Sequence, residues 1–211
     1  MVCHAGREYG AFAMKIGYGC RFALFAALLF GSAGAMQAGP FDDASGYASV
    51  GFGSIQGRQI TVEDVTGRIG ARFGSYLGVE GEVSVGVNQD HFIYAPPCNG
   101  MVCPAFEALM KARLGNAEAG YVVGFLPVAA NADLFVRAGY GAARYEAQAP
   151  FGPGFSQQGV NLGAGAQYFI DGGNGLRFDY TRTGFGNDSP VGREAVGSGA
   201  NVWSLAYTRQ F

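Results

Sequence analysis

Apolar and polar side chains alternate along short segments of the chain beyond residue 40. In the clearest segment, Val79, Val83 and Val85 fall on one face of an extended chain, and Glu80 and Glu82 fall on the other. Because no 3.6-residue apolar period is sustained anywhere, the pattern predicts strands rather than helices. We expect eight strands, at residues 47–54, 66–75, 77–88, 115–125, 134–145, 160–170, 176–183 and 202–211.

The predicted connections alternate in length. Long polar connections are expected at residues 55–65, 89–114, 146–159 and 184–201, and the others are short. One short connection is Asp171-Gly172-Gly173-Asn174-Gly175, whose residue types tolerate positive φ angles. Short turns at one end and long loops at the other are typical of antiparallel up-and-down barrels in outer membranes.

The composition favours a membrane protein. Only 14% of the residues are charged, against about 25% in soluble proteins, and Lys111 is the sole lysine beyond residue 40. No run after residue 40 reaches the roughly 18 apolar residues of a spanning helix, so a closed barrel is the structure that satisfies every backbone group in lipid. A net charge of −2 provides no basic field for nucleic acid.

The N-terminus has the order of a secretory signal peptide. Lys15 and Arg21 precede an apolar run at residues 22–30, and small residues follow to Ala38. Cleavage is expected after Ala35 or Ala38, and Met14 is a candidate for the true start. We therefore predict a leader at 1–38 and an eight-stranded transmembrane β-barrel at 39–211.

The polar face of the strands contains few lysines, many glycines, and arginines beside acids. These features suit the inside of a narrow barrel, where charges must be neutralised locally, better than a water-exposed surface. The predicted internal ion-pair network comprises Arg68, Arg72, Arg137 and Arg177 with Glu80, Glu82, Glu118 and Asp179. Eight strands enclose a space that side chains can fill, so no large pore is expected.

The last strand places Trp203, Leu205 and Tyr207 on one face and reaches the aromatic Phe211. This resembles the terminal signal that outer-membrane barrels present to the barrel-assembly machinery, although Arg209 stands where the pattern usually has an apolar residue. With the segments 163–168 and 176–180, this end of the chain resembles the small OmpA/OmpX-type outer-membrane barrels. The resemblance implies a monomer in the bacterial outer membrane that contacts lipid and lipopolysaccharide. It implies a structural, adhesion or surface-interaction role, with a surface ligand bound through the outer loops.

The candidate chemistry is sparse. Cys98 and Cys103 lie in one long loop of an exported chain, which predicts a disulfide. With His91 the only nearby histidine, no metal site, cofactor or catalytic constellation is expected. Two other interpretations stay open: a soluble or periplasmic lipocalin-like barrel that binds a hydrophobic ligand, and a lipid-modifying outer-membrane enzyme.

Overall fold

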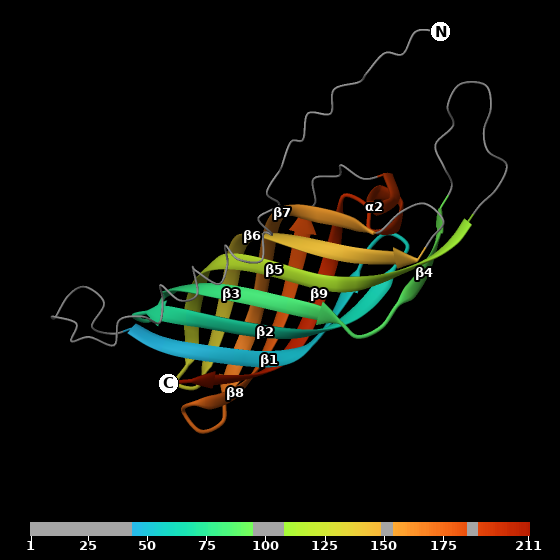
Figure 1. The fold of residues 1–211 in the computed structure, drawn as a ribbon. Helices are drawn as coiled ribbons and strands as arrows, with labels where there is room; N and C mark the ends of the chain where they lie inside the picture. Colours follow the sequence, from blue (N-terminus) through green and yellow to red (C-terminus); the bar gives the residue numbers. More distant parts are fainter. Residues whose placement is uncertain (1–43, 95–107, 149–153, 185–189) are drawn as a thin grey trace, which may run out of the picture. The chain divides into compact units, whose positions relative to one another are not determined.

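The computed structural model describes residues 44–94, 108–148, 154–184 and 190–211 (Figure 1). The chain divides after Pro40, and all described residues belong to the second unit, Phe41–Phe211. The predicted leader and the cysteine pair lie outside the described residues.

The described residues form nine strands and one short helix. The elements are β1 (Ala44–Gln56), β2 (Thr61–Phe73), β3 (Leu77–Gly86), β4 (Asp90–Tyr94), β5 (Ala108–Ala129), β6 (Ala132–Gln148), β7 (Phe155–Phe169), β8 (Asn174–Gly184), α2 (Pro190–Ala195) and β9 (Gly199–Gln210). No helix in these ranges is long and apolar enough to cross a membrane.

The strands close into an antiparallel barrel. The order is β3-β2-β1-β9-β8-β7-β6-β5-β4, and an additional pairing of β3 with β5 closes it. Because β3 and β4 both pair with β5, they share one position, and the barrel has the eight positions expected from the sequence. At the break between them, the Val87 N–H donates to the Glu63 carbonyl (2.9 Å), and the Asn88 side chain accepts from the Glu63 N–H (2.7 Å).

The strand register shows how strongly the strands tilt. A path across all eight positions starts at Gly46 and returns to the same strand at Gln56, ten residues further along. The path runs Gly46, Ala71, Val79, Val122, Ala138, Leu162, Arg182, Asn201, Gln56. A stagger of this size requires a tilt of about 40° to the barrel axis.

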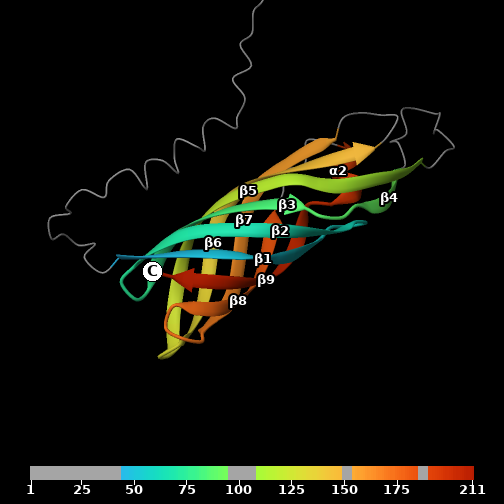
Figure 2. The same cartoon turned by 60° about the horizontal axis from the view of Figure 1, so that its bottom comes forward.

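The two ends of the barrel differ. One end, here called the turn end, carries the connections 74–76, 130–131 and 170–173 together with the C-terminus (Figure 2). The opposite end, here called the α2 end, carries α2 and the connection 57–60 (Figure 1). The prediction of a long first loop at 55–65 is wrong, because most of those residues extend β1 and β2 and pair with each other up to Gln56 and Thr61.

Side chains alternate between the outside and the inside along every strand. On β6, for example, Leu134 and Val136 are exposed, and Phe135 and Arg137 are buried. A register shift between Leu114 and Asn116 changes this parity within β5. Inward residues are therefore even-numbered before the shift and odd-numbered after it, as expected for a β-bulge.

Candidate functional site in the barrel interior

Six charged side chains meet inside the barrel, brought there from four strands. Arg68 projects from β2, Glu80 and Glu82 from β3, Arg137 from β6, and Arg177 and Asp179 from β8. Ion pairs join Arg68 Nε to Glu82 Oε2 (2.6 Å), Arg137 Nη1 to Glu82 Oε2 (2.7 Å) and Arg177 Nη2 to Asp179 Oδ1 (3.0 Å). Glu80 accepts from both Arg137 and Arg177. Three guanidinium groups therefore balance three carboxylates.

Neutral groups complete the coordination of these charges. Tyr47 Oη donates to Glu80 (3.0 Å), Arg68 Nη2 donates to Ser204 Oγ (2.8 Å), and Arg137 donates to Thr181 Oγ1. Burying ions is costly unless pairing and hydrogen bonds offset their lost hydration. This network meets that condition at all its nitrogens except Arg68 Nη1, which makes no hydrogen bond and lies 3.4 Å from Asp179 Oδ2.

Aromatic rings pack against the guanidinium groups. The Arg137 guanidinium carbon lies 4.4 Å from the centre of the Tyr121 ring, and that of Arg177 lies 4.2 Å from the Phe135 ring. Contacts of this kind are favourable cation–π interactions. These rings belong to a buried cluster of Tyr47, Ala119, Tyr121, Val123, Phe125 and Phe135.

Arg72, predicted to join the same network, pairs elsewhere. Its Nη1 lies 2.8 Å from Asp133 Oδ2, which also accepts from Gln167 Nε2 (2.8 Å). Asp133 was missed in the sequence because the predicted strand began at Leu134. It shares the parity of Phe135 and Arg137, and extending the strand by one residue would have placed it inside the barrel.

The prediction that Glu118 faces the lumen is wrong. Glu118 is register partner to Val83, which is 62% exposed on the outer wall, and its neighbour Ala119 is buried inside. Side chains alternate along β5 as predicted, but the face that was assigned to the lumen is the one that points outward. The apolar face of β5 fills the lumen because its aromatic rings pack against the arginines. Asp133, as the partner of Arg72, thus takes the role that was predicted for Glu118.

The α2 end is closed by an apolar cluster, here called the outer plug. Its buried members are Ile55, Ile60, Val62, Phe92, Met110, Ala112, Leu114, Ala143, Tyr145, Phe155, Ala195, Val196 and Ala200. The connection 57–60 holds α2 over the end, because the N–H groups of Arg58 and Gln59 donate to the carbonyls of Val196 (3.0 Å) and Ala195 (2.9 Å).

A small cavity of about 50 Å³ remains between the ion network and the outer plug. Asp64, Asn161 and Tyr145 line it, and each has a buried side-chain oxygen without a hydrogen-bond partner in the protein. The cavity has room for about two or three water molecules, and these three oxygens are the groups that would bind them. It does not form a wide channel.

The outer wall is apolar. Trp203, Leu205 and Tyr207 project outward from β9, as their shared parity predicted, and Phe211 is also exposed. The backbone N–H and carbonyl of Phe211 each bond to Gly46 (2.9 Å), so this residue continues the pairing of β9 with β1. Trp203 stands beside Tyr180, with ring centres 4.4 Å apart.

No cluster of three or more histidine, cysteine or acidic side chains within the described ranges could hold a metal ion. His91 lies on β4, on the exposed side of the strand, with Lys111 as its register partner. His91 is therefore not assigned as a catalytic base.

The closed barrel, its lipid-compatible wall and its charge-balanced interior define a small transmembrane β-barrel. The chain belongs to the outer membrane protein beta-barrel domain family, which matches residues 23–211. It is therefore a protein of the bacterial outer membrane. No match was found among curated protein sequences.

Solved structures with the same fold include other small outer-membrane barrels. The N-terminal β-barrel domain of Pseudomonas aeruginosa OprF is 13% identical, with a TM-score of 0.52 over 79% of this chain and 97% of that one. Ail, the attachment invasion locus protein of Yersinia pestis, is 12% identical, with a TM-score of 0.50 over 80% and 99%. Neisserial surface protein A is 13% identical, with a TM-score of 0.44 over 80% and 98%. At these identities the likeness concerns the fold alone.

The alternative of a soluble lipocalin-like barrel requires the apolar face to point inward around the whole barrel. On β6 and β8, Leu134, Val136, Leu176 and Phe178 point outward instead, and Arg137, Arg177 and Asp179 are buried. On β9, Trp203, Leu205 and Tyr207 also point outward. β5 is the exception described above.

Proposed function

We propose that this protein is a monomeric, non-porin membrane anchor that displays a rigid surface for adhesion or for maintaining the envelope. The observation that carries the proposal is the filled interior. An ion network, an aromatic cluster and the outer plug occupy successive parts of it. A barrel filled in this way gives solutes no open path.

The lengths of the strands support a display role. β5 has 22 residues, about twice the 9–11 that a strand needs to cross a membrane. At its start β5 pairs with β4, whereas β8 pairs with β7 only from Asn161 onward. Parts of β4, β5, β6 and β7 therefore project past their neighbours toward the α2 end (Figures 1 and 2).

The projecting sheet faces outward from the cell if the short turns lie on the periplasmic side, as they do in outer-membrane barrels generally. Its outer face exposes Ile93 opposite Leu109, with Lys111 and Arg113 below them. The apolar pair beside the cationic Lys111 offers contacts to a partner surface, whereas Arg113 is paired with Glu146. We assign the surface-ligand role to this sheet and its loops.

Conductance measurements in planar bilayers test the non-porin part. The purified barrel should give no channel steps of porin size, and a general porin reconstituted in the same bilayers serves as the positive control. Frequent large steps from the wild-type protein would refute a sealed interior.

Adhesion of whole cells tests the display part. The tip variant replaces residues 93–109 with a two-residue turn, and the control variant replaces the turn-end connection 130–131 with Asn-Gly. Cells are compared for binding to immobilised glycosaminoglycans, matrix proteins and glass. Loss of binding in the tip variant alone is expected. Equal binding by all cells, with equal amounts of barrel in the membrane, would contradict the adhesion role, and a detergent-sensitivity assay of the same strains then tests envelope maintenance.

Three parts of the proposal concern residues whose roles come from the sequence. We propose that residues 1–38 are removed as a leader during export, and that Cys98 and Cys103 form a disulfide. We also propose that Trp203, Leu205, Tyr207 and Phe211 form the signal read by the assembly machinery. Their outward position leaves them accessible to such a partner.

We further propose that the protein is not an enzyme. The buried acids that could serve as general acids or bases, such as Glu80 and Glu82, are engaged by Arg137 and its neighbours. Ion pairing of this kind explains them without catalysis. Lipid analysis of a deletion strain tests this, and a specific change in lipid A structure would contradict it.

A further inference from the structure

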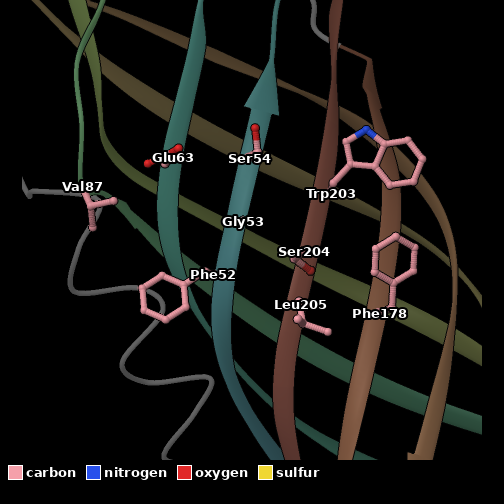
Figure 3. Close-up of a pocket in the computed structure, with 9 residues that line it drawn as sticks. All are labelled: Phe52, Gly53, Ser54, Glu63, Val87, Phe178, Trp203, Ser204 and Leu205. Carbon is pink, nitrogen blue, oxygen red and sulfur yellow. The ribbon is translucent and has the colours of Figure 1, made fainter.

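A groove of about 420 Å³ runs across the outer wall where β1 lies between β2 and β9 (Figure 3). Phe52 and Leu205 form its side toward the turn end, and Trp203 and Phe178 stand on the β8–β9 side. Glu63 and Val87 stand on the opposite side. The groove faces the surroundings of the barrel and is separate from the interior site.

The small side chain of Ser54 creates this hollow. Ser54 projects outward between two larger neighbours, because it is register partner to both Glu63 and Trp203. Figure 3 shows Ser54 between Glu63 and Trp203, with Phe52 and Phe178 further along the wall.

The groove combines hydrocarbon-compatible walls with one negative charge. Phe52 is 70% exposed and Trp203 is 41% exposed, so both present ring surface to the surroundings. Glu63 forms no salt bridge with any residue in the described ranges, and its backbone N–H is the group that Asn88 engages. Its carboxylate is thus available to an external cation.

The groove lies at the level of a membrane interface. Glu63 is two residues from the α2-side end of β2, and Ser54 is two residues from the corresponding end of β1. Trp203 and Tyr180 lie in contact nearby, with their ring planes tilted by 46°, and aromatic residues form the girdles of outer-membrane barrels. A lipid lying in the groove would have its chain toward Phe52 and Leu205 and its headgroup at Glu63.

We propose that this groove binds a membrane lipid whose headgroup carries an ammonium, with the cation between the Glu63 carboxylate and the Trp203 indole. An acidic group with an aromatic face is the combination that recognises ammonium ions. A headgroup with phosphate and no amine would bring a second negative charge against Glu63. The groove therefore selects among lipids by headgroup charge, while its apolar walls accept any acyl chain.

Trp203 is the only tryptophan of the chain, so its fluorescence reports on this groove alone. The protein is reconstituted in dodecyl maltoside micelles, whose headgroup carries no charge, with increasing amounts of brominated phosphatidylethanolamine or brominated phosphatidylglycerol with identical chains. Bromine quenches tryptophan at short range. We expect phosphatidylethanolamine to be favoured about five-fold at half-maximal quenching, from a partly exposed cation–π contact and an exposed ion pair together.

Two matched variants isolate the charge. Glu63→Gln keeps the shape of the groove and should reduce the preference to less than two-fold. Glu118→Gln removes another outward carboxylate, on β5, and should leave the preference unchanged. Heat-modifiability on unboiled gels verifies that both variants are folded.

Equal quenching by the two lipids, or a preference that survives in Glu63→Gln, would overturn the proposal. A preference for phosphatidylglycerol would overturn it as well, because it would show that the groove attracts anions. These outcomes are independent of adhesion and conductance, so the proposed function stands or falls separately.

Discussion

Replacing Arg177 with methionine tests whether the ion network holds the barrel together. Arg177 is fully buried, contacts Glu80 and Asp179 and lies against the Phe135 ring. Methionine approximates its aliphatic volume but removes the charge. The three carboxylates of Glu80, Asp179 and Glu82 then share the two remaining guanidinium groups, those of Arg68 and Arg137.

The expected cost follows from that imbalance. Removing one partner of a buried ion pair costs about 3–5 kcal/mol, chiefly because an uncompensated charge stays buried. The Glu80→Gln variant leaves three guanidinium groups with two carboxylates, and it should lower the free energy of unfolding by a similar amount. In the double variant, two guanidinium groups face two carboxylates, so its loss should be smaller than the sum of the single losses by about 2–3 kcal/mol.

Unfolding by guanidinium chloride in detergent micelles measures these changes in the free energy of unfolding, with Trp203 fluorescence and gel mobility as two probes. The midpoint for Arg177→Met should fall by about 1 M. The control is Arg113→Met, which removes an exposed pair with Glu146 whose side chains are each 55% exposed and should cost at most about 1 kcal/mol. If Arg177→Met matched this control, or if the double variant lost the full sum, the network would not have the stabilising role described.

Three further predictions concern separate parts of the chain. Gly70→Ala should lower the free energy of unfolding by about 1–3 kcal/mol, since its Cβ would lie 2.7 Å from the Val79 carbonyl and closer still to Tyr47; Gly120→Ala, with nothing within 4 Å, should be neutral in the same unfolding assay. Hydrogen bonds from Asn174 and Gly173 lower the pKa of Asp171, so the contribution of its carboxylate to stability is present at neutral pH and disappears as pH falls through that lowered pKa. The stabilities of Asp171→Ala and wild type should therefore converge as the pH of the unfolding assay is lowered, and a constant difference would contradict this. Thiol alkylation followed by mass spectrometry should label Cys98 and Cys103 only after reduction.

Most of the fold was predictable because alternation and turn chemistry are local signals. β8 is the clearest example: Phe178 lies outside, Arg177 and Asp179 lie inside, and the Asp171 turn precedes them as expected. The two faces of β5 were exchanged in the prediction because its apolar face lines the lumen. Alternation identifies two faces, and only partners on other strands decide which face meets lipid.

The ion network was predicted more accurately in composition than in pairing. Arg68, Arg137 and Arg177 do meet Glu80, Glu82 and Asp179, but Arg72 required Asp133, which lay one residue outside the predicted strand. The stagger of ten residues around the barrel determines which side chains stand opposite each other. That stagger depends on register between strands distant in sequence, and no single segment contains it.

The pairing of β1 with β9 has a consequence for how the protein reaches its folded state. Val50 and Tyr207 are register partners although more than 150 positions separate them in the chain. Contacts so remote in sequence form slowly, because a long loop must be ordered before they contribute. Until this seam forms, β1 and β9 each present unpaired backbone groups, which hydrocarbon does not tolerate. Closure of the seam and entry into the bilayer must therefore proceed together, and a polypeptide arrested before β9 emerges would be a target for proteolysis rather than a partly inserted barrel.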